Sequence, residues 1–196
     1  MIAAELHIDS SDVIVASTGV IGQVLPIEPI ANSVKTLAEA LSPTGSNDAA
    51  KAIMTTDTVE KEYALEVELD GKMVTIGGIT KGSGMIHPNM ATMLGFLTTD
   101  ASITSELLNE ALHTAIEDTF NMVSVDGDTS TNDSVLLMAN GLAGNKEITE
   151  ADEDYREFCA VLHEVMTELS KKIAGDGEGA TCLFEVKVLG ADTKEN

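Results

Sequence analysis

The dipeptide Asp70-Gly71 constrains the fold of this chain more than any other short feature. Apolar and polar residues alternate on both sides of it, through residues 63–79 (YALEVELDGKMVTIGGI). Such alternation is typical of half-buried β-strands, and Asp-Gly between two such runs is typical of a two-residue hairpin turn. The sequence therefore predicts two antiparallel strands joined at this turn.

Further strands and helices are predicted from the spacing of apolar residues elsewhere. Runs of β-branched or apolar residues predict three more strands, over residues 12–18, 133–139 and 181–189. Helical spacing predicts four helices, over residues 26–42, 48–54, 104–122 and 149–174. Because strands and helices alternate, the predicted class is α/β or α+β, with helices covering the faces of a sheet. We find no internal repeat and no low-complexity linker, so one unit over residues 1–196 is predicted.

Local signals predict where two of these helices begin and end. Asn47 or Asp48 is expected near the N-terminal cap of the short second helix. Thr149 is expected to begin the last helix, with Asp152 three residues further on, as in a capping box. Gly175 is expected to end that helix.

The net charge excludes one class of partner. The 196-residue chain has 33 acidic and 11 basic side chains, for a formal net charge of −22. A field of this sign repels phosphate groups, so nucleic acid is not expected as a partner.

No apolar run is long enough for a membrane-spanning helix, and the N-terminal residues lack the regions of a signal peptide. The two cysteines lack metal-site spacing and are expected to be reduced thiols, as in a cytoplasmic protein.

Two segments look like ligand-binding loops without meeting the requirements of one. Residues 126–133 (DGDTSTND) begin a stretch that lacks the glycine at the sixth position and the glutamate at the twelfth of a calcium-binding EF-hand loop. Residues 77–84 (GGITKGSG) lack the Gly-Lys-Ser/Thr ending of a phosphate-binding loop. The histidines show no ligand spacing. No metal ion and no bound cofactor are therefore predicted.

A threonine lies where a glycine-spaced loop meets an apolar segment. The loop of residues 81–84 (KGSG) leads through Ala91 and Thr92 into the apolar residues 93–97. A threonine hydroxyl needs a base to become a nucleophile, and cleavage of the bond before Thr92 would supply its own α-amine, which titrates at about 7.7–8.0. A small preceding residue and upstream glycines permit the tight turn that such a cleavage needs. On these residues alone a second interpretation, a buried and hydrogen-bonded threonine, stays open.

Five segments, in order and spanning nearly all of the chain, resemble the bifunctional glutamate N-acetyltransferase or ornithine acetyltransferase family of arginine biosynthesis. They are VASTGVIG (15–22), AIMTTDT (52–58), GGITKGSGMIHPNMATMLGFLTTDA (77–101), NMVSVDGDTSTNDSVLLMANG (121–141) and GDGEGATCLFEVKV (175–188). The resemblance implies that a precursor cuts itself between Ala91 and Thr92, and that the new N-terminal threonine then carries the acetyl group. It also implies stacked β-sheets between helix layers, as in this family and the self-processing aminopeptidases.

The resemblance also implies roles for individual residues. They fall into two groups: the nucleophile Thr92 with the oxyanion donors Thr18 and Gly19, and the substrate contacts Thr55, Lys81, Thr92 and Glu178. A lysine can pair with a substrate α-carboxylate, and a glutamate can pair with the side-chain ammonium of ornithine. The segment SVDGDTSTND has no assigned role, and its Asp126, Asp128 and Asn132 are expected to organise turns.

The implied reaction is ping-pong acetyl transfer from N2-acetylornithine to glutamate through acetyl-Thr92, without a bound cofactor. Whether acetyl-CoA serves as a co-substrate stays open. Family members extend beyond this chain at both ends, so we expect an incomplete core unit that assembles as a homo- or hetero-oligomer of processed chains in the cytoplasm. Two alternatives remain: an N-terminal-nucleophile amidohydrolase, in which water replaces glutamate, and an uncleaved, non-catalytic remnant.

Overall fold

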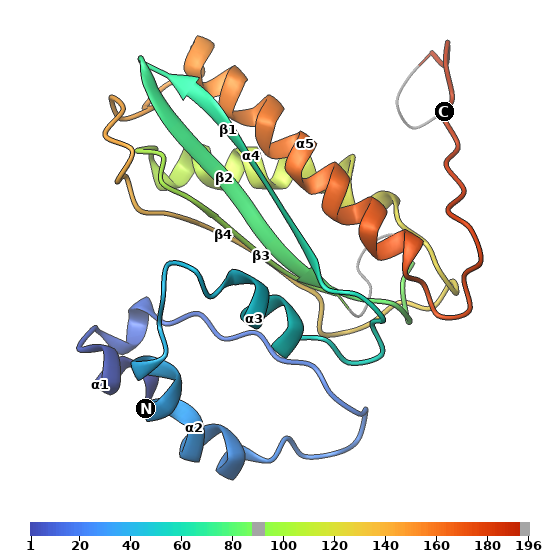
Figure 1. Cartoon of the computed structure of the whole chain (residues 1–196). Coiled ribbons are helices and arrows are strands. Elements are labelled where there is room, and N and C mark those ends of the chain that lie inside the picture. Colours follow the sequence, from blue (N-terminus) through green and yellow to red (C-terminus); the bar gives the residue numbers. More distant parts are fainter. Residues whose placement is uncertain (88–92, 193–196) are drawn as a thin grey trace.

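The computed structural model describes residues 1–87 and 93–192 of the chain. These residues form a mixed α/β fold around one four-stranded sheet (Figure 1). The strands, in their order across the sheet, are β1 (Lys61–Leu69), β2 (Lys72–Lys81), β3 (Leu94–Thr99) and β4 (Ser134–Ala139). The pairs β1–β2 and β2–β3 are antiparallel, whereas β4 runs parallel to β3. The predicted fold class is confirmed, whereas the described residues do not form the second, stacked sheet that we expected.

The predicted hairpin joins β1 to β2. Leu69 pairs with Lys72, and Asp70 and Gly71 between them have φ angles of 49° and 68°. Positive φ at both central residues is what a type I′ turn requires, and such a turn matches the right-handed twist of the strands. The prediction from the Asp-Gly dipeptide is therefore confirmed.

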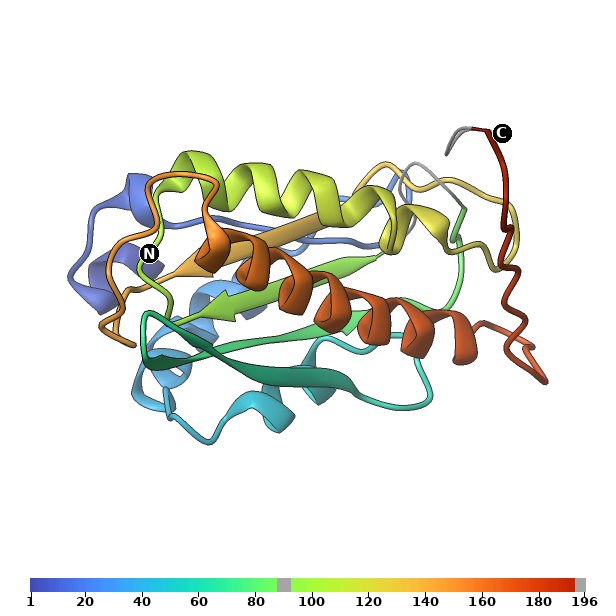
Figure 2. The same cartoon turned by 90° about the horizontal axis from the view of Figure 1, so that it is seen from above.

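Two long helices cover one face of the sheet. The helices α4 (Ser105–Glu117) and α5 (Glu153–Gly175) run side by side across it, and a short 3₁₀ turn, η2 (Phe120–Met122), follows α4 (Figure 2). The apolar face of α5 is fully buried through Phe158, Leu162, Val165, Met166 and Leu169. Full burial of such side chains contributes about 1.5–3 kcal/mol each, so this helix holds the main core of the chain together.

The N-terminal region lies beyond the opposite face of the sheet (Figure 1). Its elements are α1 (Ile2–Leu6), η1 (Ser10–Asp12), α2 (Ile27–Glu39) and α3 (Ser46–Ala52). The helices predicted over 26–42 and 48–54 are confirmed as α2 and α3. Asn47 and Asp48 lie near the N-terminal cap of α3, as predicted, in the first turn of the helix; the cap residue itself is Gly45, which provides no side-chain acceptor.

The start of α5 also differs from the prediction. The residue before its first turn is Asp152, and its carboxylate accepts a hydrogen bond of 3.0 Å from the Tyr155 amide. Thr149 therefore lies before the helix, because Asp152 provides the side-chain acceptor that the free amides of the first turn need. The helix ends at Gly175, as predicted.

Two predicted strands are wrong. Residues 12–18 and 181–189 belong to no strand, and their apolar side chains face outward, with Val15 77% and Phe184 84% exposed. A strand is stable only when a neighbouring strand pairs with its backbone groups. No strand in residues 1–87 or 93–192 pairs with either segment. A run of apolar residues was therefore not sufficient to form a strand.

Candidate functional site

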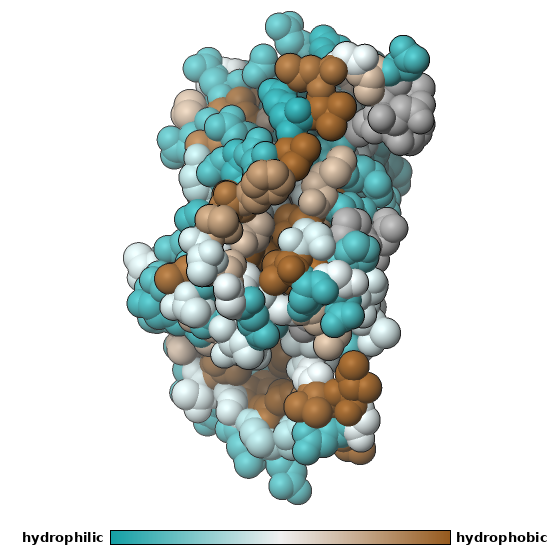
Figure 3. All heavy atoms as spheres, turned by 90° about the vertical axis from the view of Figure 1, so that its right-hand side faces the viewer, coloured by the Kyte–Doolittle hydropathy of each residue, from teal (hydrophilic) through white to brown (hydrophobic). Residues whose placement is uncertain are grey.

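The strand directions bring several sequence motifs to one end of the sheet. Because β2 is antiparallel to β3 and β3 is parallel to β4, the end of β2 meets the starts of β3 and β4. Lys81 lies opposite Leu94, and Leu94 lies opposite Ser134. The first residue of β1, Lys61, pairs with Thr80 at the same end. Figure 3 faces this end of the molecule, where apolar side chains gather in several places between hydrophilic ones.

Lys81 is buried at this end, with 2% of its surface exposed. Burial lowers the pKa of its ammonium, and the negative charges of Asp57 and Asp133 partly offset that effect. The positive charge of Lys61 lowers the pKa further. The side chain predicted to bind a substrate carboxylate is therefore already surrounded by charged groups of the protein.

Glu178 lies against the glycine loop that follows Lys81. Its backbone amide donates a hydrogen bond of 2.7 Å to the Ser83 carbonyl oxygen. Its carboxylate lies beside Gly84, where a Cβ atom would be 2.7 Å from Cδ and 2.9 Å from each oxygen. The side chain of Glu178 is exposed, so it is accessible to a ligand that approaches this loop.

Thr55 belongs to a third segment that packs against the same loop. Its amide donates a hydrogen bond of 3.1 Å to Asp57 Oδ2, and Asp57 Oδ1 accepts one of 2.7 Å from the Gly82 amide. The hydroxyls of Thr56 and Ser83 are hydrogen-bonded at 2.6 Å. The structure therefore brings the predicted substrate contacts Thr55, Lys81 and Glu178 to one end of the sheet, from segments far apart in the sequence.

Asp133 holds the backbone at the start of β3. Its Oδ1 accepts a hydrogen bond of 2.8 Å from the amide of Met93. Burial raises the pKa of Asp133 to about 6, against the lowering effects of the Met93 amide, the nearby Ser130 hydroxyl and the charge of Lys81. Ala91 and Thr92, the predicted cleavage junction and nucleophile, lie outside the described residues, and the described chain resumes directly after them at Met93, one residue before β3.

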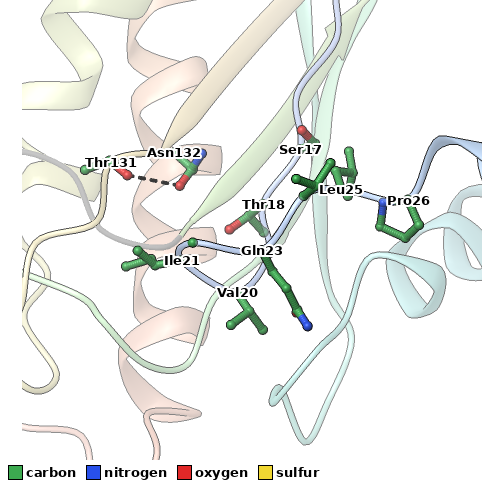
Figure 4. Close-up of a pocket in the computed structure, with 12 residues that line it drawn as sticks. Ser17, Thr18, Val20, Ile21, Gln23, Leu25, Pro26, Thr131 and Asn132 are labelled. Atoms are coloured by element: carbon green, nitrogen blue, oxygen red, sulfur yellow. Dashed lines mark hydrogen bonds between the residues drawn. The ribbon is translucent and has the colours of Figure 1, made fainter.

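Thr18 and Gly19 lie in a separate loop. This loop and residues 131–132 line a hollow of about 450 Å³ (Figure 4). Thr18 is half-buried and Gly19 is exposed. Because Asn132 directly precedes Asp133, the hollow adjoins the start of β4, but within residues 1–87 and 93–192 no hydrogen bond joins this loop to Lys81 or Glu178.

Sequence reasoning missed the charged residues that hold these loops together. Asp57, Lys61 and Asp176 form a buried ionic cluster, with Lys61 Nζ 2.7 Å from Asp57 Oδ1 and 2.6 Å from Asp176 Oδ2. Asp126 was expected to organise its own turn, and its carboxylate does so by accepting a hydrogen bond from the Asp128 amide. The sequence did not predict that the same carboxylate also accepts hydrogen bonds from the amides of Met85 and Ile86 in a distant loop. The only signal in the sequence was the place of each aspartate next to a glycine-rich or threonine-rich motif.

The described part of the chain has neither a cluster of metal-binding side chains nor a helix that could span a membrane. No group of three or more histidine, cysteine, aspartate or glutamate side chains there is placed to hold a metal ion. Among the helices of residues 1–87 and 93–192, none has the length and apolar character needed to cross a membrane.

Comparison with known proteins identifies close relatives over almost the full chain. The ArgJ family model matches residues 1–196. The arginine biosynthesis bifunctional protein ArgJ of Symbiobacterium thermophilum is 58% identical over 179 residues, which are 91% of this chain and 44% of that protein. ArgJ 1 of Clostridium acetobutylicum is 53% identical over 194 residues, 99% of this chain and 48% of that protein. The crystal structure of argJ from Bacillus halodurans matches at 50% identity over 46% of this chain and 42% of that one, with a TM-score of 0.45. The chain spans about half the length of the curated relatives it matches.

Proposed function

Because the chain belongs to the ArgJ family, we propose that it transfers an acetyl group from N2-acetylornithine to glutamate in arginine biosynthesis. The match of the family model to all of residues 1–196 carries this proposal. The geometry supports it, because Thr55, Lys81 and Glu178 gather at the end of the sheet where the chain resumes one residue after Thr92.

The proposed reaction has two half-reactions that share Thr92. The core unit, residues 1–196, first cuts itself between Ala91 and Thr92: the Thr92 hydroxyl attacks the Ala91 carbonyl, the acyl group moves from nitrogen to oxygen, and water hydrolyses the resulting ester. The Thr92 Oγ then attacks the acetyl carbonyl of N2-acetylornithine, its own α-amine accepts the hydroxyl proton, and the amide C–N bond breaks as that proton passes to the departing ornithine. In the second half-reaction the α-amine of glutamate attacks the acetyl ester, the ester C–O bond breaks, and N-acetylglutamate leaves. The proton lost by the attacking amine passes through the Thr92 α-amine to Thr92 Oγ.

The remaining residues bind substrate or stabilise charge in this proposal. The Thr18 hydroxyl and the Gly19 amide donate hydrogen bonds to the oxyanion that forms in each half-reaction. Lys81 attracts the α-carboxylate that both substrates carry, and Glu178 attracts the side-chain ammonium that only ornithine carries. Thr55 contacts the substrate from the third segment. Acetyl-CoA is a candidate second acetyl donor, and we place the processed chains in the cytoplasm as an oligomer.

Mass spectrometry of the purified chain tests this proposal. We expect two pieces that meet at Ala91/Thr92, and an added acetyl group on the piece that begins with Thr92 after incubation with N2-acetylornithine. The Thr92→Ala variant should stay in one piece and take up no acetyl group, whereas the control Thr98→Ala, at an exposed position of β3, should behave like the unaltered chain.

The same experiment distinguishes the alternatives. Release of free acetate in the presence of glutamate, without N-acetylglutamate, would indicate an amidohydrolase. An intact chain that never becomes acetylated would indicate a non-catalytic remnant. Cleavage of Thr92→Ala at the same bond would disprove cleavage by Thr92.

A further inference from the structure

The ionic cluster of Lys61, Asp57 and Asp176 lies beneath the loops of the candidate site. Its three side chains are 0%, 0% and 7% exposed, respectively. Burial alone would raise the pKa of Asp57 and of Asp176, but the hydrogen bonds from Lys61 and from nearby backbone amides hold both pKa values below the ordinary value. Both carboxylates are therefore ionised near neutral pH, and the cluster is a true ion triad inside the protein.

Each carboxylate of the cluster also binds a loop. Asp57 accepts hydrogen bonds from the amides of Thr55 and Gly82. Asp176 accepts one of 2.9 Å from the Thr58 amide and another from the Thr58 hydroxyl. Through these two carboxylates, the buried ammonium of Lys61 links the segments 55–58, 81–84 and 176–178.

The predicted substrate contacts lie at the points where these loops meet the cluster. Thr55 itself donates to Asp57, Lys81 directly precedes Gly82, and Glu178 follows Asp176 by two residues. A change in the cluster would therefore move all three contacts relative to one another.

Stability alone is a weak reason for such a cluster. Removing charges from water is costly, and well-packed apolar side chains of similar volume often stabilise a fold as much or more. The best-attested benefit of buried charges is a defined arrangement of the elements that carry them. The contacts of this cluster are confined to one end of the sheet, where the candidate site lies.

We propose that Lys61, Asp57 and Asp176 are positioning residues that set the spacing between the Lys81 cation and the Glu178 carboxylate, and so select a substrate that carries both an α-carboxylate and a distal ammonium. The proposal rests on the proposed function for the identity of that substrate. N2-acetylornithine uses both charges, whereas glutamate uses only Lys81. The cluster therefore matters more for the first substrate than for the second.

Hydrogen–deuterium exchange tests the coupling of the loops without any assay of activity. In Asp176→Asn the acceptor for Thr58 remains, but the charge that holds Lys61 is lost. We expect the exchange rates of the Thr55, Gly82 and Glu178 amides to rise together by about tenfold or more, relative to the amides of β3. The Thr55 and Gly82 amides donate to the Asp57 carboxylate, and the Glu178 amide donates to Ser83, which directly follows Gly82.

Two further variants keep this test decisive. Asp154→Asn makes the same change at the opposite end of α5, where the carboxylate accepts a 3.4 Å hydrogen bond from the Asp70 amide, and should leave the three rates unchanged. Thr58→Val removes only the hydroxyl contact to Asp176 and should shift all three rates in the same direction by a smaller factor, even if Asp176→Asn fails to fold. Faster exchange confined to Thr58 and its neighbours would overturn the coupling.

Ligand binding tests the selection of substrate. Calorimetric titration of the unaltered chain and of Thr58→Val with N2-acetylornithine and with glutamate should show a larger rise in Kd for N2-acetylornithine. Equal changes for both ligands would leave the cluster as a structural feature and overturn the positioning role. If the unaltered chain binds neither ligand, the proposed function fails, and so does the choice of substrate that rests on it, while the exchange rates still decide whether the cluster couples the loops.

Discussion

Replacing Gly84 by alanine should separate substrate recognition from stability. A Cβ at this position would lie 2.7 Å from Glu178 Cδ and 2.9 Å from both carboxylate oxygens, so the carboxylate must move. Moving an exposed side chain out of its rotamer costs about 0.5–1.5 kcal/mol. Alanine in place of glycine offsets this by about 0.4–1 kcal/mol, because it restricts the unfolded chain, and Gly84 does not adopt a positive φ. The free energy of unfolding should therefore change by less than about 1 kcal/mol.

Gly78→Ala is the matched control for stability. Its Cβ would lie 2.9 Å from the Phe96 carbonyl oxygen, 3.1 Å from Leu97 Cγ and 3.3 Å from Leu169 Cδ1. These atoms belong to the sheet backbone and the packed core, so they cannot move aside. Overpacking of this kind typically costs about 1–3 kcal/mol. Urea denaturation of both variants measures the difference, as a change in midpoint at constant m value.

Binding measurements complete the prediction for Gly84→Ala. An exposed ion pair contributes about 0.2–1 kcal/mol, so displacing the Glu178 carboxylate should raise the Kd for N2-acetylornithine by up to about fivefold. The Kd for glutamate should not change. Glu178→Gln should give the same loss, and the double variant should lose no more, because both changes remove one interaction. An additive loss, or an equal loss for glutamate, would refute the assignment of Glu178 to ammonium recognition.

Three other changes give distinct outcomes. Lys61→Met should lower the free energy of unfolding by about 3–5 kcal/mol in urea denaturation, because it removes the cation that pairs with two buried carboxylates. The control Lys35→Met breaks an exposed ion pair with Glu39, whose side chains are 74% and 68% exposed, and should change the free energy of unfolding by less than about 1 kcal/mol. The pKa of Asp133 is about 6 in the folded chain against an ordinary 3.8, so the folded state binds that proton more tightly than the unfolded chain does. The free energy of unfolding, relative to that of Asp133→Asn, should therefore fall by at most about 3 kcal/mol as the pH rises from about 4 to about 6. A constant difference between the two proteins across that range would contradict the shift. Thr18→Ala should slow acetyl transfer on the order of 10²- to 10³-fold without altering the far-ultraviolet circular dichroism, and an unchanged rate would exclude Thr18 from the oxyanion site.

Local interactions explain the parts of the fold that could be predicted from the sequence. The hairpin depends on two adjacent residues, Asp70 and Gly71, whose preference for positive φ acts without help from the rest of the chain. The helices α4 and α5 follow from apolar residues spaced along their own lengths. Each of these signals lies within one segment of the chain, so the sequence alone was sufficient to predict the hairpin and the two helices.

The buried cluster could not be predicted, because Asp176 is far from Asp57 and Lys61 in the chain. Lys61 and Asp176 are 115 residues apart in sequence and meet only after α5 has packed on the sheet. In sequence, Lys61 resembles an exposed residue of an alternating strand, and Asp176 resembles part of a flexible glycine-rich loop. The same limit explains the error at residues 12–18, since their β-branched composition favours a strand but cannot supply a pairing partner.

In the proposed reaction Lys81 attracts a substrate carboxylate, and the burial of Lys81 limits how that carboxylate can use its charge. Asp57 and Asp133 already stabilise the ammonium, so a third negative group must compete with them. Asp57 is bound by Lys61 and by two backbone amides, and its low pKa makes it costly to protonate. Asp133 has a pKa of about 6, so taking up a proton near neutral pH costs it far less. Asp133 is therefore the carboxylate that can become neutral when a substrate carboxylate approaches Lys81, and binding at that position should be favoured by the uptake of one proton.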